Sequence, residues 1–403
     1  MRILQLSSRL PYPLTDGGAI GIYKPTEAIA RLGHEITFVT YPDPDPEVTK
    51  EAIEKFSRFC RIELVNRLLP SRNSTLLRTM FSGAYPIERR MMPEMFKLLE
   101  KLLTSNSYDL VHLDASHMGK YGLWIKERFG LPVILRQHNF ETLIYKRFAA
   151  NARNPIAKIV ASIHAKRMLA EETRFMNGLD GVISITAEDD AIMQDLAPKT
   201  KFWIIPAGVD TEYFTPQPVE SKENTILWIG GMDWDPNRDA VEFFAKEIFP
   251  LVVERLPDTG FTIVGNGTES LSAIASKSNG KIRLLGRVPD IRYELAKAKV
   301  MICPLRVGGG MRLKLLDFFA AGKAVVSTRI GAEGNLGIDG EHLLLRDDPR
   351  SFADAVISLL ENSELRESLG VNARKLAEEK YSWQSIAIQF NSVYEEVTQI
   401  ENE

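Results

Sequence analysis

The stretch CPLRVGGGMRLKLLDFFAAGKAVVSTRIGAEG, residues 303–334, decides the fold more than any other part of the chain. The apolar run at 300–303 predicts a short buried strand, which Pro304 ends. Three glycines at 308–310 then predict a loop, and the apolar spacing that follows Arg312 predicts a helix. This order of strand, glycine loop and helix is typical of sheets that place a ligand beyond the carboxyl ends of their strands.

The same stretch carries the residue types that hold an anionic ligand. Glycines at 308–310 let backbone amides approach the ligand closely, and the helix N-terminus adds partial positive charge. Arg312 and Lys314 supply two cations, and Asp317 follows about one turn deeper, where its carboxylate can accept hydrogen bonds from a ribose diol. Each feature alone is more often an ordinary loop, a solvated cation or a core position. Their combination favours a nucleotide site.

Short apolar strands alternate with helical patterns along both halves of the chain. The expected strands are 3–6, 36–39, 110–113, 133–135 and 181–185 in the first half, and 225–229, 262–264, 281–285, 300–303 and 324–327 in the second. Such alternation predicts an α/β fold with two doubly wound parallel sheets. At 403 residues the chain is also longer than one typical domain.

Prolines and glycines between 205 and 222 interrupt both patterns and mark the expected domain boundary. We therefore expect a first domain at 1–204, a second at 205–382, and an amphipathic terminal helix at 383–403 that crosses back to the first domain.

Composition limits the classes of function. A net charge of −3 argues against bulk nucleic-acid binding. Two cysteines, Cys60 and Cys303, predict neither a disulfide framework nor a metal knuckle, and fit a reducing cytoplasm. We see no signal-peptide pattern and no apolar run long enough to span a membrane, so the chain is expected to be cytoplasmic or peripheral at the inner face of a membrane.

The glycine loop, the basic pair, the acidic residue and the segment AGKAVV resemble the signature of retaining GT-B glycosyltransferases, specifically glycosyltransferase family four. Further matches in chain order are PYPLTDGGA (11–19), LRQHNFE (135–141), IPAGVDTEYF (205–214), WIGGMDWDPNRDAVEFF (228–244), FTIVGNG (261–267) and LLGRVPDI (284–291). The resemblance implies two Rossmann-like domains facing across a cleft. It also implies transfer of a sugar from a nucleoside diphosphate donor to a hydroxyl acceptor, a glycan or a lipid-linked sugar, with retention and without metal or cofactor.

The sequence departs from the family pattern at three positions. The family commonly has two Glu eight positions apart, where this chain has Gly309 and Asp317. Ala324 stands where the family usually has Pro. The phosphate site is kept, but a side-chain contact to the donor sugar from position 309 is absent, and the donor sugar and base, UDP or GDP, stay open.

The resemblance assigns roles to individual residues. His138 would face the donor sugar near the reacting carbon, and Arg312 and Lys314 would hold the diphosphate. The expected nucleotide-sugar contacts are Gly17, Gly18, Gly231, Trp234 or Asn237, Arg238, Arg287, Val288, Gly309, Gly310, Met311 and Asp317. Asp114 or His117 is expected on the acceptor side. Two Asp-x-Asp segments, at 43–45 and 233–235, are interpreted as a linker and part of the phosphate loop rather than as metal motifs.

Residues 55–90 are strongly basic, with Lys55, Arg58, Arg61, Arg67, Arg72, Arg78, Arg89 and Arg90 against Glu63 and Glu88. Interleaved apolar residues, among them Phe56 and Leu68, suggest a face that meets an anionic membrane, although a solvated helix face is the alternative. Two other functions also use this fold. A sugar-nucleotide epimerase would need acid and base carboxylates that the sequence does not identify, and a non-catalytic binding subunit would be consistent with the missing Glu.

Overall fold

The computed structural model describes residues 1–14, 16–71, 75, 79, 83–151, 154–217, 223–308 and 310–400. The chain folds as two compact units. Unit 1 comprises Met1–Pro206 together with Ile386–Glu403, and unit 2 comprises Ala207–Ser385. The expected boundaries at 204/205 and 382/383 lie beside these divisions.

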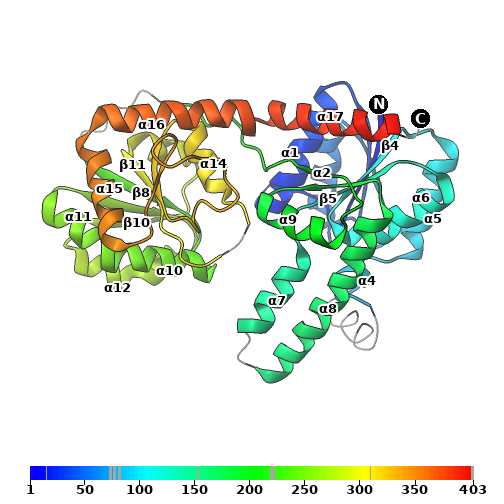
Figure 1. The fold of residues 1–403 in the computed structure, drawn as a ribbon, viewed down its shortest axis with the longest axis horizontal. Helices are drawn as coiled ribbons and strands as arrows, with labels where there is room; N and C mark the ends of the chain where they lie inside the picture. The colour runs from blue at the N-terminus through cyan, green and yellow to red at the C-terminus, as the bar shows by residue number, and fades with distance from the viewer. Residues whose placement is uncertain are drawn as a thin grey trace. The chain divides into compact units, whose positions relative to one another are not determined.

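Unit 1 is built on a seven-stranded sheet in the order β3-β2-β1-β4-β5-β6-β7, with every pairing parallel (Figure 1). Its strands are β1 (Arg2–Ser7), β2 (Glu35–Thr40), β3 (Arg61–Leu64), β4 (Leu110–Asp114), β5 (Val133–Gln137), β6 (Gly181–Ser184) and β7 (Phe202–Ile204). Its helices are α1 (Gly17–Arg31), α2 (Pro46–Phe56), α4 (Tyr85–Glu88), α5 (Pro93–Ser105), η1 (Ser116–Met118), α6 (Gly119–Phe129), α7 (Glu141–Asn151), α8 (Pro155–Gly178) and α9 (Ala187–Leu196).

Strands β1, β4 and β5 are buried on both faces, as parallel strands covered by helices must be. The strand order reverses at β1, which lies between β2 and β4. Loops that follow β1 and β4 therefore diverge to opposite sides of the sheet, and this switch point is where such sheets bind ligands.

Unit 2 is built on a six-stranded parallel sheet in the order β10-β9-β8-β11-β12-β13. Its strands are β8 (Thr225–Ile229), β9 (Gly260–Val264), β10 (Ile282–Gly286), β11 (Val300–Cys303), β12 (Ala324–Ser327) and β13 (Leu344–Leu345). Its helices are α10 (Asp235–Phe243), η2 (Phe244–Ile248), α11 (Phe249–Arg255), η3 (Thr268–Leu271), α12 (Ser272–Ala275), η4 (Ser276–Ser278), α13 (Arg292–Lys297), α14 (Leu313–Ala320), α15 (Pro349–Glu361), α16 (Ser363–Leu376) and η5 (Ala377–Tyr381). Two parallel-sheet α/β domains confirm the predicted fold class.

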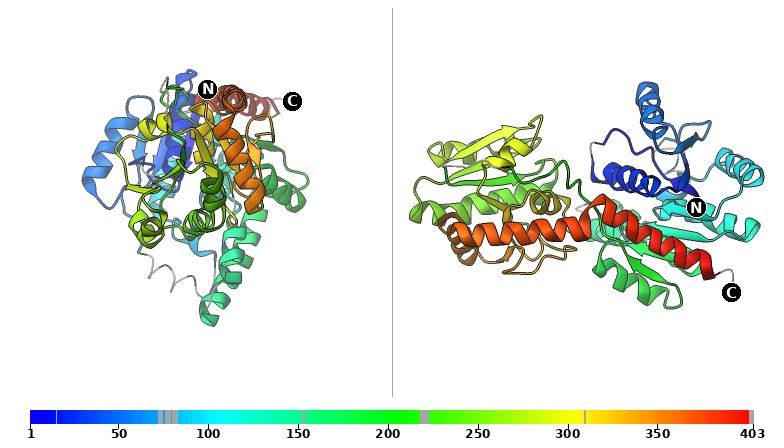
Figure 2. Two further views of the ribbon diagram at one scale, coloured as in Figure 1. Left: turned by 90° about the vertical axis from the view of Figure 1, so that its left-hand side faces the viewer. Right: turned by 90° about the horizontal axis from the view of Figure 1, so that it is seen from above.

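The last helix, α17 (Trp383–Ile400), begins in unit 2 and continues into unit 1 (Figure 2). Within unit 1, Phe390 and Tyr394 are buried, and the Tyr394 hydroxyl lies 2.6 Å from His112 Nδ1 on β4. The Arg136 guanidinium lies 5.0 Å from the centre of the Phe390 ring. The helix thus packs against two central strands of unit 1, β4 and β5.

Across the described residues, no helix is both long and apolar enough to cross a lipid bilayer.

Candidate functional site

The loops of unit 2 that follow β8, β9 and β10 lie side by side at the carboxyl edge of the sheet. Backbone hydrogen bonds join them: Gly230 N donates to Val264 O (2.9 Å), Gly265 N to Gly286 O (2.8 Å), and Met232 N to Asn266 O (2.7 Å). A Cβ at Gly265 would lie 2.2 Å from Gly230 O, so only glycine permits this approach of two loops. The edge presents closely spaced backbone amides.

Lys314, in the first turn of α14, points at the loop after β8. Its Nζ lies 3.3 Å from Asn237 Oδ1 and 3.6 Å from the centre of the Trp228 ring. A Cβ at Gly230 (φ 153°) would lie 2.7 Å from the same Nζ, so glycine leaves the room in which the ammonium group sits. Burial lowers the pKa of Lys314 to about 8. A diphosphate would restore the full charge, because an anion favours the protonated form.

Arg312 precedes α14 and is 7% exposed. Its guanidinium lies 5.5 Å from the centre of the Trp234 ring and 4.0 Å from Glu333 Oε2. A Cβ at Gly308 (φ 148°) would lie 2.2 Å from Arg312 Nη2. Gly308 therefore lies directly against the guanidinium, and the two predicted cations approach one edge from the same helix end.

Asp317 lies on α14, one turn beyond Lys314, and is half-buried. Burial alone raises the pKa of its carboxyl group to about 7. An acid in this position ionises readily once hydroxyl donors are offered to it, because hydrogen bonds to the charged form stabilise that form. This behaviour suits the predicted ribose contact.

The other predicted residues of unit 2 take different places at this edge. Arg238 donates to Met232 O (2.9 Å) and so supports the loop itself. Trp234 and Arg287 are exposed, whereas Val288 and Met311 pack against the core. Gly231 accepts a hydrogen bond from Asn237 Nδ2 (2.8 Å), and Gly310 has a φ of 77°. Gly309 lies outside the described residues.

Asn237 is buried and supports the loop after β8. Its side chain is 7% exposed and connects the Gly231 carbonyl to the Lys314 ammonium. The sequence predicts Asn237, as an alternative to Trp234, as a sugar contact. Its amide nitrogen and its amide oxygen are both hydrogen-bonded within the protein. Trp228 and Glu333 were missed altogether, because an aromatic residue inside a strand and a carboxylate after β12 carry no signal in the sequence.

In unit 1, the N-terminus of α1 is capped by its own chain. Asp16 accepts a hydrogen bond from Ala19 N (2.9 Å) and pairs with Arg9 at 2.8 Å. Gly17 and Gly18 form the first turn and are exposed. A carboxylate thus already occupies part of the place that a donor diphosphate would take, so phosphate binding by these two glycines stays a prediction.

His138 follows β5 and lies against a buried carboxylate. Its Nε2 is 3.2 Å from Asp114 Oδ1, and the other oxygen of Asp114 accepts from Gln5 Nε2 (2.5 Å). Burial raises the pKa of Asp114, but the interactions of its carboxylate with His112 and His138 hold that pKa well below its usual range. Burial also lowers the pKa of His138, against the opposing effect of Asp114.

The contact between His138 Nε2 and Asp114 indicates where the proton of the imidazole lies. An ionised Asp114 can only accept, so a neutral His138 carries its proton on Nε2 and keeps a lone pair on Nδ1. His138 is therefore prepared to accept a hydrogen bond from a hydroxyl group rather than to donate one. His112 continues the network from Asp114 to the Tyr394 hydroxyl.

Of the two residues expected on the acceptor side, Asp114 or His117, Asp114 is not accessible. Its side chain is 0% exposed, and it lies beneath His138 at the end of β4. The sequence did not reveal this, because a carboxylate at a strand end is ordinarily solvated. His117 is partly buried beside this network, and burial holds its pKa well below the usual range.

The basic and apolar residues of 55–90 do not form one exposed face. Phe56 is buried against Tyr23 and Phe38. Arg58, Arg61 and Arg67 pair with Glu54, Glu63 and Glu94, and Arg90 donates to the Ser8 and Pro86 carbonyls. Arg72, Arg78, Met80 and Phe81 lie outside the described residues. The described part of this segment thus combines exposed arginines that pair with carboxylates, the core residue Phe56 and the exposed Leu68, so a membrane-facing role for it stays a prediction.

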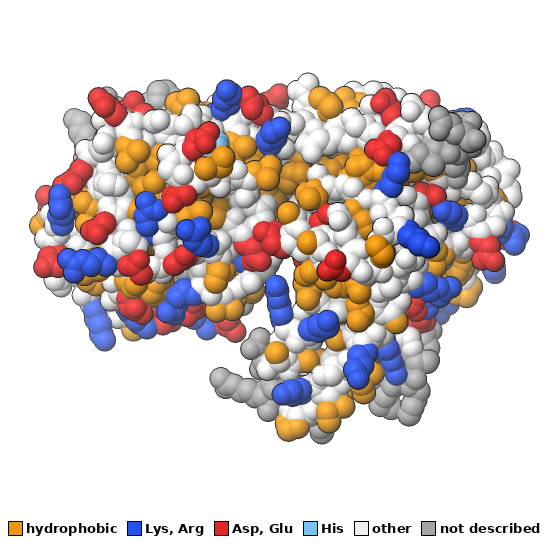
Figure 3. Space-filling view, viewed as in Figure 1, with side chains coloured by type: hydrophobic (Ala, Val, Ile, Leu, Met, Phe, Trp, Pro, Cys, Tyr) orange, Lys and Arg blue, Asp and Glu red, His pale blue; other side chains and the backbone are white. Residues whose placement is uncertain are grey.

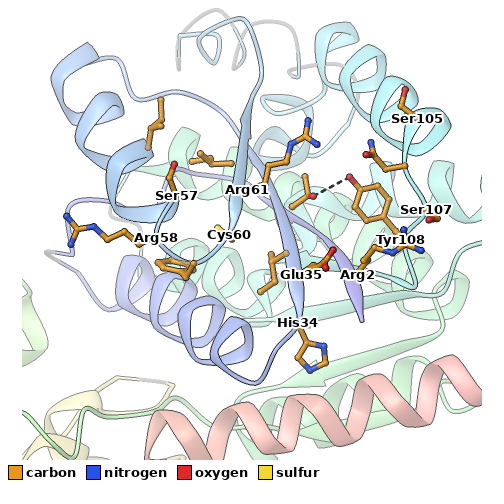
Figure 4. A pocket seen from close by; sticks show the side chains of 16 residues that line it. Arg2, His34, Glu35, Ser57, Arg58, Cys60, Arg61, Ser105, Ser107 and Tyr108 are labelled. Atoms are coloured by element: carbon orange, nitrogen blue, oxygen red, sulfur yellow. Dashed lines mark hydrogen bonds between the residues drawn. The ribbon is translucent and has the colours of Figure 1, made fainter.

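A large cavity of about 1020 Å³ lies elsewhere in unit 1, at the amino ends of β2 and β3 (Figure 4). It is lined by Glu35, Arg61 and Tyr108, among others, and lies at the opposite edge of the sheet from His138. It is therefore separate from the predicted sugar site.

Comparisons with known proteins agree with this geometry. Residues 15–213 match the family model described as Glycosyltransferase Family 4, and residues 223–362 match the one described as Glycosyl transferases group 1. Sucrose-phosphate synthase from Thermosynechococcus elongatus has the same fold, with a TM-score of 0.72 and 18% identity over 99% of this chain and 100% of its own.

Two relatives in sequence cover different shares of the chain. An uncharacterized 44.6 kDa protein in the cps region of Klebsiella pneumoniae is 23% identical over 98% of this chain and 99% of its own. The phosphatidyl-myo-inositol mannosyltransferase of Mycobacterium tuberculosis (strain H37Rv) is 34% identical over 48% of this chain and 53% of its own. The protein is a glycosyltransferase with a GT-B fold. It belongs to glycosyltransferase family four.

Proposed function

We propose that this enzyme transfers a hexose from a nucleoside diphosphate donor to a hydroxyl of a lipid-linked acceptor, with retention of configuration and without a metal ion. The observation that carries the proposal is the pair Arg312 and Lys314, which lie against Gly308 and Gly230 at the carboxyl edge of unit 2. The mannosyltransferase relative supports a hexose and a lipid acceptor.

Each part of the proposed site has a chemical role. Arg312 and Lys314 bind the diphosphate and compensate the charge that grows on it as the glycosidic bond breaks. Asp317 accepts from the ribose diol. His138 accepts a hydrogen bond from a sugar hydroxyl through Nδ1, which orients the sugar and favours an oxocarbenium-like transition state. The leaving phosphate takes the acceptor proton, so the mechanism requires no protein nucleophile.

Two measurements on the full-length protein test the proposal. A thermal-shift screen of UDP, GDP and ADP sugars should single out one nucleotide, since a ligand at about 100 times its Kd stabilises a protein by roughly 2.7 kcal/mol. That donor should then be consumed only with a lipid-linked acceptor, and equally well after chelation of divalent ions. Loss of transfer on chelation would overturn the metal-independent mechanism, and conversion of the sugar without acceptor would favour an epimerase.

A further inference from the structure

Helices α7 and α8 form a hairpin that extends away from the sheet of unit 1 (Figures 1 and 2). Small side chains are buried in this hairpin, whereas several large apolar side chains are exposed. The buried positions along it include small residues, Ala149 on α7 and Ala161 and Ala165 on α8. Large apolar side chains occupy the exposed positions instead.

The exposed apolar residues recur at a spacing of four on each helix. Ile144 and Phe148 on α7 are 47% and 59% exposed, and Ile159 and Ile163 on α8 are 60% and 41% exposed. Residues four apart share one face of a helix, so each helix presents an apolar pair to solvent. A hairpin stabilised only by its own packing would bury these side chains and expose the alanines. Apolar surface of this kind marks an interaction site.

The part of the hairpin between Glu141 and Glu171 carries charge of one sign. Residues 142–170 contain six Lys and Arg and no Asp or Glu, in a chain whose net charge is −3. Lys146, Lys158 and Lys166 are exposed among the apolar residues, and Figure 3 shows orange and blue side chains on the visible face of the hairpin. Two such surfaces repel each other, which argues against a second copy as the partner. The surface complements an anionic one.

The base of the hairpin is attached to the strand that carries His138. Glu172 of α8 accepts hydrogen bonds from Gln137 Nε2 (2.6 Å) at the end of β5 and from the Thr142 amide (3.0 Å) and hydroxyl (2.6 Å) at the start of α7. Burial raises the pKa of Glu172 to about 7. One buried side chain thus joins both helices to the strand end next to the proposed sugar site.

We propose that the α7–α8 hairpin docks on a membrane that contains anionic lipid. The apolar pairs enter the boundary between headgroups and acyl chains, and the lysines bind the headgroup phosphates. The position of the hairpin beside His138 means that docking brings a lipid-linked acceptor to the site. That last step rests on the proposed function, whereas docking itself does not.

The test is flotation of the full-length protein with vesicles of phosphatidylcholine alone or with about a third phosphatidylglycerol. Binding should require phosphatidylglycerol and should weaken as salt screens the charges. Lys146→Gln with Lys158→Gln should lower the partition coefficient about 25-fold, because each basic residue near the surface contributes about fivefold. Phe148→Ser with Ile159→Ser should lower it by at least as much, while the charge is kept.

Matched controls come from unit 2. The control variants are Val371→Ser, at a residue that is 68% exposed, and Lys277→Gln, at another exposed residue. Vesicle binding should be unaffected by either change. All variants should keep the circular dichroism spectrum and the thermal unfolding profile of the parent, which shows that they are folded. The proposal is overturned if the parent binds both vesicles equally, if it binds neither, or if the control variants lose as much binding as the hairpin variants. Self-association that Phe148→Ser abolishes, without vesicle binding, would assign the surface to a second copy instead.

Discussion

Lys314 and Asp317 illustrate how a site can prepare two charges before its ligand arrives. Burial moves the pKa of the ammonium group down to about 8 and the pKa of the carboxyl group up to about 7. Each group therefore titrates close to physiological pH and is charged in only part of the molecules, because burial out of water disfavours the charged form. A nucleoside diphosphate would drive both groups to their charged forms, so its binding must depend on pH.

We expect nucleotide affinity to be greatest between about pH 7 and pH 8. Binding favours protonated Lys314, so affinity falls as pH rises above about 8, and it favours ionised Asp317, so affinity falls as pH drops below about 7. Calorimetric titration across pH 6–9 measures this. Lys314→Arg should remove the fall in affinity at high pH, and Asp317→Asn should remove the fall at low pH. Dividing the affinity of each variant by that of the parent at the same pH cancels the titration of the ligand itself. Parallel profiles for the parent and both variants would disprove these assignments.

His138 should separate binding from chemistry. His138→Ala should lower the turnover rate by about 10²–10³-fold, because a transition-state contact is lost, while diphosphate affinity is nearly unchanged. Arg312→Ala is the comparison, since it should reduce affinity and turnover together. Titration calorimetry and single-turnover kinetics on the same preparations distinguish the two. A large loss of diphosphate affinity in His138→Ala would place this residue at the phosphate instead.

At the scale of elements, the loop between β11 and α14 depends on the missing side chain of Gly308. A Cβ there would overlap the Arg312 guanidinium at 2.2 Å, and the φ of 148° is one that other residues rarely adopt. The position of the Arg312 guanidinium before α14 therefore depends on the loop, and a change at Gly308 displaces this guanidinium. The absence of a side chain at Gly308 thus leaves the space that the Arg312 guanidinium occupies.

Gly308→Ala should accordingly weaken nucleotide binding, though no more than Arg312→Ala does, because the guanidinium is displaced and not removed; the strained backbone should cost about 1–3 kcal/mol of stability. Gly340→Ala is the matched control, because Gly340 also has a positive φ of 79° but has nothing within 4 Å of its Cβ position. Thermal unfolding and nucleotide titration of both variants make the comparison. Equal loss of affinity in the two variants would show that strain, rather than displacement of Arg312, is the cause.

At the scale of the whole molecule, α17 is shared by the two units. Its residues from Ile386 onward belong to unit 1, where Phe390 and Tyr394 cover His112 and Arg136. Removing this cover would expose a buried cation and the far end of the network that holds His138. The stability of unit 1 thus depends on a segment that follows unit 2 in the chain.

Phe390→Ala should destabilise unit 1 by about 3–5 kcal/mol, the usual cost of truncating a buried phenylalanine. Tyr394→Phe, which removes only the hydroxyl bound to His112, should cost about 0.5–1.5 kcal/mol. Scanning calorimetry with and without the nucleotide should show that the ligand-shifted transition of unit 2 is unaffected by either change. A shift of both transitions by the same amount would mean that the two units unfold as one.

Local pattern was sufficient to predict two parallel sheets, the central strands and the glycine loop with its two cations, because these follow from apolar periodicity and from residue types at short spacing. It was not sufficient for the short edge strands β3, β7 and β13, whose exposed or brief sequences carry little periodicity. Nor did it show that Asp114 lies beneath His138, or that the apolar residues of 55–90 are partly core while those of α7 and α8 face solvent. Those properties depend on which face of a helix or strand packs against another element. Asp114, His138 and Tyr394 are far apart along the chain, so the sequence gives no sign that they belong to one hydrogen-bond network. The sequence by itself determined the class of fold and predicted which residues form the proposed nucleotide site. Only the tertiary structure decided which charges are buried, which are paired and which surface is left exposed, because burial is a property of packing rather than of order along the chain.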